Sequence, residues 1–404
     1  MRIINVKDMG LEAVEKLLKK PAFDQVELNP RIREANKKLF GADLTAAEIV
    51  DKIVGDVRRD GDEAVIKYTK LIDRTEFTPE EFVVTEAEYE AAYQEADPAV
   101  VESLRKAAEN VRLYHQEQKP NSWMTYRDKG SILGQSVIPL DRVGIYVPGG
   151  TAAYPSSVIM NAMPAVVAGV KEIIMMVPPK NGKINPYVLV AAKEAGVSKI
   201  FKIGGAQAIA AMAFGTETIP RVDKITGPGN IFVTLAKKAV YGHCDIDMLA
   251  GPSEILIVAD KTADPAYTAA DMLSQAEHDM LASSIVITDS PELAEKVAVE
   301  AEKQLKVLPR EEITRASLDR NGMIIITEDI MQAVELANVS APEHMEVLTE
   351  QPFQLLPYIR HAGAVFLGAY SPEPLGDYFA GPNHVLPTGG TARYYSVLNV
   401  ETFM

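Results

Sequence analysis

The chain has 404 residues and a formal net charge of -15. This acidic balance argues against a nucleic-acid surface or binding to anionic membranes, and no apolar run reaches the ~18 residues that a membrane span needs. Because one hydrophobic core rarely grows past ~250–300 residues, the length predicts at least two cores.

The cysteine content and the N-terminal residues indicate the cellular compartment in which the protein is expected to work. Cys244 is the single cysteine, so no intrachain disulfide forms, and the N-terminus lacks the apolar core of a secretion signal. Both features favour a reducing cytoplasm.

The first third of the chain is predicted to be mainly helical. Residues 1–40 are expected to form an N-terminal arm with a short strand, a helix at Leu11–Lys20 and a proline-containing linker. Further helices are expected at Thr45–Leu71 and Pro98–Gln118. Trp123–Pro139 has the pattern of a β-hairpin that turns near residues 128–130.

From Val143 onward, short apolar strands alternate with helices, a pattern typical of parallel sheets with crossover helices. Two sets of strands predict two related α/β domains. The expected strands are Val143–Val147, Glu172–Val177, Lys199–Ile203 and Val222–Thr226, then Ile255–Val258, Ser284–Thr288, Met323–Thr327, Glu346–Leu348 and Ala364–Leu367. Helices are expected between them, for example Ala206–Phe214 and Asn230–Val240.

Glycine turns follow three of the predicted strands, at Pro148–Gly150, Gly204–Gly205 and Gly227–Gly229. Ligands of open α/β sheets bind at the carboxyl ends of strands, where glycine permits close approach to the backbone. None of the three has the G-x-G-x-x-G spacing of a dinucleotide fingerprint. Taken alone, they indicate plain strand-to-helix turns.

The helix predicted at Pro265–Glu277 has Asp264 as its N-cap and Pro265 at its first position. Gln275 and His278 are three residues apart and therefore share a helix face. The pair offers an amide oxygen and an imidazole to a metal, but spacing alone favours an ordinary polar helix end.

Other polar residues are ambiguous on their own. Glu343 and His344 form an adjacent carboxylate–imidazole pair that suits acid–base chemistry but also suits a solvated loop. Asp377 and Ser253 read as turn formers. His115 is expected at the surface, and His243 and His361 are interpreted as structural.

Several long motifs occur in a fixed order and cover most of the chain. They are Arg142–Gly150, Gly204–Gln207, Gly227–Asn230, Ile246–Glu254 with Gln275 and His278, Ala341–His344, Gly376–Tyr378 and Asn383–Thr388. Together they resemble the histidinol dehydrogenase family of zinc- and NAD-dependent enzymes, which oxidise L-histidinol to L-histidine.

The resemblance implies an α/β fold with two related parallel-sheet domains and an N-terminal helical arm. Each domain would be an incomplete Rossmann-like fold of the kind found in aldehyde dehydrogenases. Residues 41–145 and 254–388 would form a discontinuous domain, and residues 146–253 an inserted one. Residues 389–404 would begin a C-terminal tail. The family's intertwined homodimer is also implied.

The resemblance also assigns site residues. Tyr146, Gln207 and Asn230 would contact NAD. Glu343 and His344 would be the acid–base residues, with His344 taking the alcohol proton and Glu343 activating water for the aldehyde step. The implied zinc ligands are Gln275, His278 and Asp377. The implied substrate contacts are Ser253, Gln275, His278, His344 and Asp377.

Family members continue beyond the equivalent of Met404 into a helical tail that supplies a further histidine zinc ligand and a substrate-binding glutamate. No residue of this sequence is assigned those roles, so either the chain is a fragment or the homologue completes its site otherwise. His384 is a conceivable substitute, but it has its own place in the Asn383–Thr388 motif. Two alternatives therefore stay open: a homologue that binds NAD and zinc with impaired catalysis, and a relative that oxidises another amino or polar alcohol. An aldehyde dehydrogenase would need a cysteine nucleophile, but Cys244 lies outside every glycine turn and is interpreted as incidental.

Overall fold

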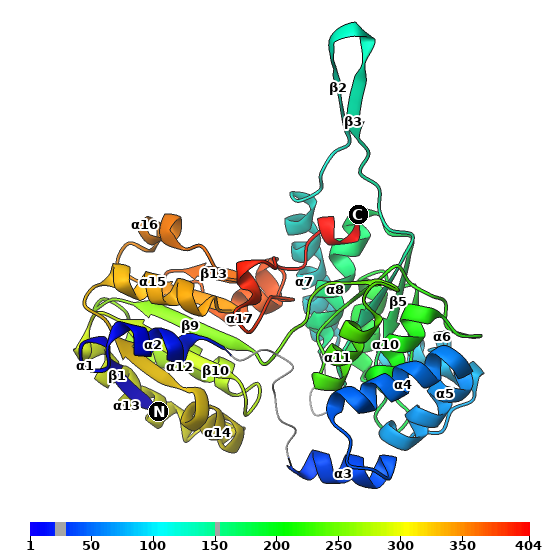
Figure 1. The fold of residues 1–404 in the computed structure, drawn as a ribbon, viewed down its shortest axis with the longest axis horizontal. Helices are drawn as coiled ribbons and strands as arrows, with labels where there is room; N and C mark the ends of the chain where they lie inside the picture. Colours follow the sequence, from blue (N-terminus) through cyan, green and yellow to red (C-terminus); the bar gives the residue numbers. More distant parts are fainter. Residues whose placement is uncertain (21–29, 150–153) are drawn as a thin grey trace. The chain divides into compact units, whose positions relative to one another are not determined.

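The computed structural model describes residues 1–20, 30–149 and 154–404, which form two compact units with one parallel sheet each (Figure 1). The described residues of the first unit are 1–20, 250–377 and 386–397; those of the second are 30–149, 154–249, 378–385 and 398–404. The predicted α/β fold class with two parallel sheets is confirmed.

The sheet of the first unit has the strand order β1-β11-β10-β9-β12-β13, and all neighbouring strands are parallel. Helices cover both faces, so the middle residues of the central strands are apolar and buried, as in Ile255–Val258 of β9 and Ile285–Ile287 of β10. The strands are β1 (Arg2–Asn5), β9 (Glu254–Ala259), β10 (Ser283–Thr288), β11 (Met323–Ile326), β12 (His344–Leu348) and β13 (Ala364–Leu367). The helices are α1 (Val6–Met9), α2 (Leu11–Leu18), α12 (Pro265–Ala276), α13 (Pro291–Leu305), α14 (Glu311–Asn321), α15 (Ile330–Ser340), α16 (Pro352–Leu355) and α17 (Glu373–Leu375).

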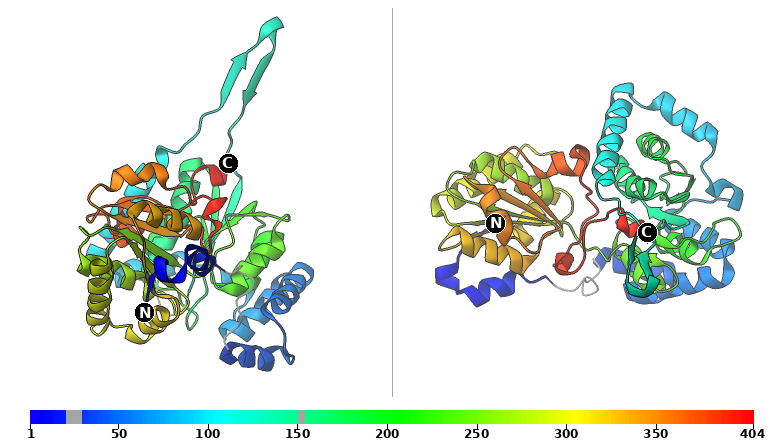
Figure 2. Two further views of the ribbon diagram at one scale, coloured as in Figure 1. Left: turned by 60° about the vertical axis from the view of Figure 1, so that its left-hand side comes forward. Right: turned by 90° about the horizontal axis from the view of Figure 1, so that it is seen from above.

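Alternate residues of each central strand enter different cores. Leu256 and Val258 pack with α2 and α15, whereas Ile255 and Ile257 pack with α12, α13 and α14. Figure 2 gives two further views of these layers. The amide hydrogen bonds that cap α12 follow the prediction, because Asp264 accepts from the Ala266 N–H and Pro265 occupies the first helical position.

The N-terminal arm is the first correction. Its strand and helix form as predicted, but they belong to the core of the first unit. β1 pairs in parallel with β11, and Val14 and Leu18 of α2 are fully buried. The apolar spacing of α2 predicts a buried face but cannot specify which element covers it. Part of the expected linker, residues 21–29, lies outside the described residues.

The sheet of the second unit has the order β6-β5-β4-β7-β8 and is also parallel. Its strands are β4 (Arg142–Tyr146), β5 (Glu172–Met176), β6 (Lys199–Phe201), β7 (Lys224–Thr226) and β8 (Asp245–Ile246). The helices of this unit are α3 (Pro30–Phe40), α4 (Ala46–Asp60), α5 (Asp62–Tyr68), α6 (Glu86–Glu95), α7 (Pro98–Gln116), α8 (Pro155–Ala168), α9 (Pro186–Glu194), α10 (Gly205–Phe214) and α11 (Ile231–Val240). The predicted hairpin is present as β2 (Trp123–Tyr126) and β3 (Ile132–Gln135).

The structure groups residues 41–145 differently from the prediction, which joined them to residues 254–388. They pack with the sheet that contains β4, because α4 lies on α10 and α11, α7 lies on α8, and α6 lies on α9. Backbone hydrogen bonds add to this packing: the Val84 N–H donates to the Ile200 carbonyl at 2.9 Å, and the Lys202 N–H donates to the Phe82 carbonyl at 2.7 Å.

His115 is a further correction, because it is buried rather than at the surface. Its Nδ1 lies 2.8 Å from the Val111 carbonyl, and its Nε2 lies 3.3 Å from the Asn383 side-chain nitrogen. Asn383 also donates to the Met160 carbonyl. His115 thus helps to hold a late segment of the chain against α7 and α8 in the second unit.

Residues 389–404, expected to begin a tail, are divided between the two units. Residues 398–404 pack in the second unit, where the Leu140 N–H donates to the Phe403 carbonyl at 2.9 Å and the Phe403 ring is fully buried. Thr388, at the end of the last motif, accepts the Gly251 N–H at 2.6 Å in the first unit.

Tyr68 gives a test of the packing between α4 and α5. Its hydroxyl donates to Asp56 at 2.6 Å. Burial alone would raise the pKa of Asp56, but hydrogen bonds from Tyr68, Arg59 and Lys67 lower it to about 2. We expect Tyr68→Phe to lower the free energy of unfolding at pH 7 by about 1.5–3 kcal/mol, the usual contribution of a hydrogen bond to a charged group.

The pH dependence follows from the depressed pKa. The pKa of Asp56 lies below the ~3.9 of an unfolded aspartate, so its stabilisation is complete above about pH 4 and is lost as the pH falls toward about 2. Denaturant unfolding at several pH values should show the deficit of Tyr68→Phe shrinking in that window. Tyr114→Phe, at a half-exposed position, is the control; an equal deficit in both variants would contradict the role of Asp56.

Candidate functional site

The predicted chemical residues of the first unit gather at the amino edge of its parallel sheet. His344 is the first residue of β12, Glu343 precedes it, and Ser253 precedes β9. Crossover helices run antiparallel to the strands they connect, so the last turn of α12 returns to the same edge. That turn carries Gln275, and His278 follows it directly.

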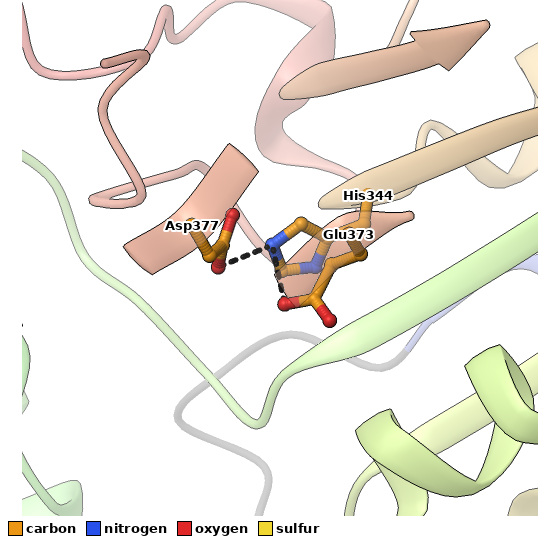
Figure 3. Close-up of side chains that lie close together, drawn as sticks. All are labelled: His344, Glu373 and Asp377. Atoms are coloured by element: carbon orange, nitrogen blue, oxygen red, sulfur yellow. Dashed lines mark hydrogen bonds and ion pairs between the residues drawn. The ribbon is translucent and has the colours of Figure 1, made fainter. Parts of the chain in front are cut away.

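His344 lies at the centre of this edge and is buried. Its Nδ1 lies 3.1 Å from the Glu254 carbonyl oxygen, and its Nε2 lies 3.1 Å from Asp377 Oδ2 (Figure 3). Burial lowers the pKa of His344, but the carboxylates of Glu343 and Asp377 outweigh burial and raise it to about 10. The family resemblance makes His344 an acid–base residue, Asp377 a metal ligand and both substrate contacts, and the structure brings the two side chains into direct contact.

Glu343 is also buried, and its Oε2 accepts the Glu254 N–H at 2.9 Å. The same oxygen lies 3.7 Å from His344 Nδ1. Burial raises the pKa of Glu343 to about 7. A carboxyl group with a pKa near neutrality both accepts and returns protons at physiological pH, which is the property of a general acid–base residue.

Glu373 was missed by the sequence analysis. It is 1% exposed, and its Oε1 lies 3.9 Å from His344 Nε2 (Figure 3). One ligand atom from each of His344, Glu373 and Asp377 lies within 4.8 Å of the other two, a spacing that suits a metal ion. Glu373 stands between Pro372 and Pro374, so its surroundings in the sequence resemble a turn, and only the tertiary structure reveals its burial.

Ser274 connects this cluster to the predicted metal ligands on α12. Its Oγ lies 3.4 Å from Glu373 Oε2, and its carbonyl oxygen lies 2.9 Å from His278 Nδ1. With the Nδ1 proton donated to that carbonyl, the lone pair of His278 Nε2 is available to a ligand. The next residue, Gln275, is buried, and its Oε1 has no hydrogen-bond partner within the described part of the chain.

The predicted glycine turns gather at the carboxyl edge of the second sheet, around Tyr146. The Gly205 N–H donates to the Tyr146 hydroxyl oxygen at 3.1 Å. Gly227 has φ +114°, and a Cβ there would overlap the Tyr146 carbonyl oxygen. Gly149 and Gly204 both pack against Pro178, and Gly150 lies outside the described residues. The glycines therefore bring the backbone of several turns together at one edge.

Gln207 is two residues beyond Gly205 on α10 and is fully buried. Its Nε2 donates to Asp73 Oδ2 at 3.2 Å, and its Oε1 has no partner among the residues that the structure describes. Burial raises the pKa of Asp73 to about 6. Asp73 was not predicted as a site residue, because it is far from the glycine motifs in the sequence and follows a helix that has no visible link to them.

Asn230 has a structural role that the resemblance did not indicate. It is the N-cap of α11, and its Oδ1 accepts the N–H groups of Phe232 at 3.0 Å and Val233 at 3.3 Å. Asparagine before an apolar helix is a common N-cap. The capped helix start therefore fixes the side chain of Asn230 beside the turn at Gly227–Gly229.

The remaining candidates have ordinary structural surroundings. Cys244 is buried, and burial raises the pKa of its thiol to about 12, which is unfavourable for a nucleophile. His243 packs edge-on against Phe214, and His384 packs edge-on against Tyr378. In the parts of the chain that are described, no helix has both the length and the apolar character needed to cross a membrane.

Comparison with known proteins identifies the family. Residues 36–404 match the family model described as histidinol dehydrogenase. The chain is 57% identical over 355 residues to the histidinol dehydrogenase of Carboxydothermus hydrogenoformans, covering 88% of this chain and 84% of the relative. It is 56% identical over 355 residues to the histidinol dehydrogenase of Bacillus subtilis, with 88% and 83% covered.

A solved structure agrees with these matches. Histidinol dehydrogenase from Elizabethkingia anophelis superposes with a TM-score of 0.90 at 36% identity, and the match covers 100% of this chain and 88% of that one. The chain therefore belongs to the histidinol dehydrogenase family of oxidoreductases, which oxidise histidinol in histidine biosynthesis.

Proposed function

We propose that this protein oxidises L-histidinol to L-histidine through L-histidinaldehyde in two NAD-linked steps that share one zinc site. The observation that carries the proposal is the buried Glu343–His344 pair, which lies against Asp377 at the amino edge of the first sheet in a member of this family. A neighbouring carboxyl and imidazole provide separate proton acceptors for the two steps.

In the alcohol step, His344 Nε2 accepts the hydroxyl proton of the substrate as the carbinol carbon loses hydride. The contact from Nδ1 to the Glu254 carbonyl keeps a proton on Nδ1 and directs Nε2 toward Asp377. Engagement of Asp377 as a metal ligand would lower the pKa of His344 toward neutrality, because the carboxylate charge that raises it would be shared with the cation.

In the aldehyde step, Glu343 removes a proton from the attacking water. Its carboxyl group is suited to this role because it is buried and has a pKa of about 7. The Glu254 N–H binds its Oε2, which fixes the orientation of the carboxyl group. Ser253 lies next to Glu254 and is the proposed contact for the part of the substrate that does not react.

The residues present fit a zinc ion. Gln275 offers a buried amide oxygen that lacks a partner among the described residues, His278 offers an imidazole oriented by the Ser274 carbonyl, and Asp377 offers a carboxylate. Gln275, His278 and Asp377 would hold the ion and, with Ser253 and His344, form the substrate site. When bound, zinc would orient the imidazole and amino group of histidinol and polarise the reacting oxygen.

The residues of the second unit fit NAD, which supplies the hydride acceptor. Tyr146 offers its ring and hydroxyl, and burial raises the pKa of that hydroxyl, so it remains a neutral phenol. Gln207 offers a buried amide oxygen that has no hydrogen-bond partner among the described residues. Asn230 lies at the start of α11, where the positive end of the helix dipole favours an anion such as the cofactor's pyrophosphate.

The first prediction from this proposal concerns the metal. Loss of residues around a metal ligand commonly weakens binding by ~10–100-fold, and loss of a ligand itself should cost at least as much. His278→Ala is therefore expected to lose zinc on dialysis, as measured by elemental analysis. His361→Ala, at a histidine that the proposed site does not use, should retain it. Wild-type zinc content in His278→Ala would contradict the assignment.

The second prediction separates the two steps. His344→Asn should slow histidinol oxidation, and Glu343→Gln should slow oxidation of added histidinaldehyde more than oxidation of histidinol. Loss of a general base typically costs ~10²–10⁴ in rate. Single-turnover rates of NADH formation from each substrate measure this difference. Equal losses on both substrates in both variants would rule out divided roles.

We also propose that the protein is a homodimer in which the β2–β3 ribbon contacts a second copy. The ribbon projects from the helices of its own unit (Figure 1), and Met124 and Tyr126 are 77% and 76% exposed. The cross-strand register places Ile132 opposite Tyr126. A two-stranded ribbon is marginally stable alone, and exposed apolar surface of this kind commonly marks a protein–protein contact.

The dimer prediction uses the same ribbon. Tyr126→Ser combined with Ile132→Ser should shift the protein toward monomer at a given concentration, because apolar contact area is lost. Light scattering across a dilution series measures the shift. Val299→Ser, at a 68% exposed apolar position on α13, is the control. A wild type that is monomeric throughout would contradict the homodimer.

We also propose the cytoplasm as the compartment, which suits a chain with a single, buried cysteine.

A further inference from the structure

An ion pair between Lys237 and Asp247 is buried in the second unit, outside the residues assigned to chemistry. The two side chains are 4% and 1% exposed. Lys237 lies on α11, and Asp247 follows β8 and is the second residue of the Ile246–Glu254 motif. The proposed function gives this aspartate no role, although it stands in the motif that leads to Ser253.

The ion pair closes around the glycine turn that precedes Asn230. Asp247 Oδ2 accepts the Gly227 N–H at 2.7 Å, and Lys237 Nζ donates to the Gly227 carbonyl at 3.0 Å. The other carboxylate oxygen accepts the Met248 N–H at 2.6 Å and also pairs with Lys237. Both polar backbone groups of Gly227 are therefore bound by the two members of one ion pair.

Gly227 in turn fixes two of the residues proposed to contact NAD. Its conformation, with φ +114°, packs it so closely on the Tyr146 carbonyl that any Cβ would overlap that oxygen. Three residues later, Asn230 caps α11. Lys237 is seven residues beyond Asn230 and lies on the same face of the helix, so the pair ties α11 to the turn and to the end of β8.

Net stability is a weak reason to bury such a pair. Removing two charges from water costs about as much as their attraction returns, and apolar side chains of similar volume commonly stabilise a core as well or better. A pair with directional hydrogen bonds to one glycine instead holds the backbone in a defined geometry. The ion pair therefore has a role in shaping the turn rather than in net stability.

We propose that Lys237 and Asp247 are positioning residues for the dinucleotide: by binding both the N–H and the carbonyl of Gly227, they hold the turn against Tyr146 and place Asn230 for the cofactor. The inference rests on the proposed binding of NAD by Tyr146, Gln207 and Asn230. Neither Lys237 nor Asp247 is expected to touch the cofactor, since both side chains are enclosed.

The test uses the double variant Lys237→Met/Asp247→Asn, because removing both charges leaves no unpaired charge in the interior. NAD binding to the full chain without histidinol is measured by calorimetry. We expect the Kd for NAD to rise about tenfold or more, which corresponds to about 1.4 kcal/mol. The KM for histidinol at saturating NAD and the zinc content should stay within twofold of wild type, because the proposed substrate and zinc residues belong to the first unit.

A second ion pair, which joins β7 to β8 near the same turn, provides the control. Lys224 of β7 pairs with Asp245 of β8 at 2.9 Å. The other carboxylate oxygen of Asp245 accepts the N–H of Ile246 rather than that of Gly227. Asp245→Asn should leave the Kd for NAD within twofold of wild type. A folded double variant that binds NAD as tightly as wild type would overturn the inference, as would an equal loss of affinity in the control. Failure of the wild type to bind NAD would instead overturn the proposed function.

Amide hydrogen exchange on the wild-type protein keeps the inference testable if the double variant fails to fold. Without NAD, the Gly227 amide should exchange as slowly as the amides of β7, because it donates to an enclosed carboxylate. Fast exchange at Gly227 beside slow exchange in β7 would show that the turn is not held in advance of the cofactor, and would overturn the inference.

Discussion

Burial of charged side chains at the edges of two parallel sheets is the constraint on which the rest of this structure depends. An ionised group taken out of water costs several kcal/mol unless a partner compensates it. In the first unit His344 is compensated by Glu343 and Asp377, and in the second Lys237 is compensated by Asp247. Each set of charged partners also fixes the position of a group. The carboxylate of Asp377 orients the imidazole of His344, and the Lys237–Asp247 pair holds the turn at Gly227. The chemistry proposed for the protein uses groups whose positions are already determined by this electrostatic requirement.

The two units place their functional residues at opposite edges of their sheets. The glycine turns of the second unit follow β4, β6 and β7 and so lie at the carboxyl edge, the usual ligand position in an open α/β sheet. The chemical residues of the first unit lie at the amino edge, because Gln275 is in the last turn of the returning helix α12, His278 follows that turn, and His344 opens β12. The crossover helix α12 thus adds candidate metal ligands at the amino edge of the sheet, beside the residues that the strands themselves place there.

The local structure could be predicted well from the sequence, because it depends on local chemistry. The alternating apolar strands, the hairpin turn and the cap of α12 by Asp264 are all found near their predicted positions. The partners of these elements were harder to predict. The buried faces of α2 and α4 show only that something covers them. The covering elements, α15 for α2 and α10 with α11 for α4, are far away in the sequence. Glu373, Asp73 and the burial of His115 were missed for the same reason, since each depends on contacts between distant segments.

Two buried glutamines extend this argument from folding to function. The Oε1 atoms of Gln275 and Gln207 have no hydrogen-bond partner within the described residues, and an unsatisfied buried acceptor costs about 1–3 kcal/mol. A sequence selected only for stability would replace such a side chain by an apolar one or give its oxygen a donor. Gln275 is next in the chain to Ser274, which contacts Glu373 of the His344, Glu373 and Asp377 cluster. The amide nitrogen of Gln207 donates to Asp73, in the unit that carries Tyr146. A ligand that contacts either oxygen recovers the lost interaction, and it stabilises the folded protein by mass action because the unfolded chain has no such site. The unfavourable burial of these two oxygens is therefore the physical link between the stability of each unit and the ligand that we propose it binds.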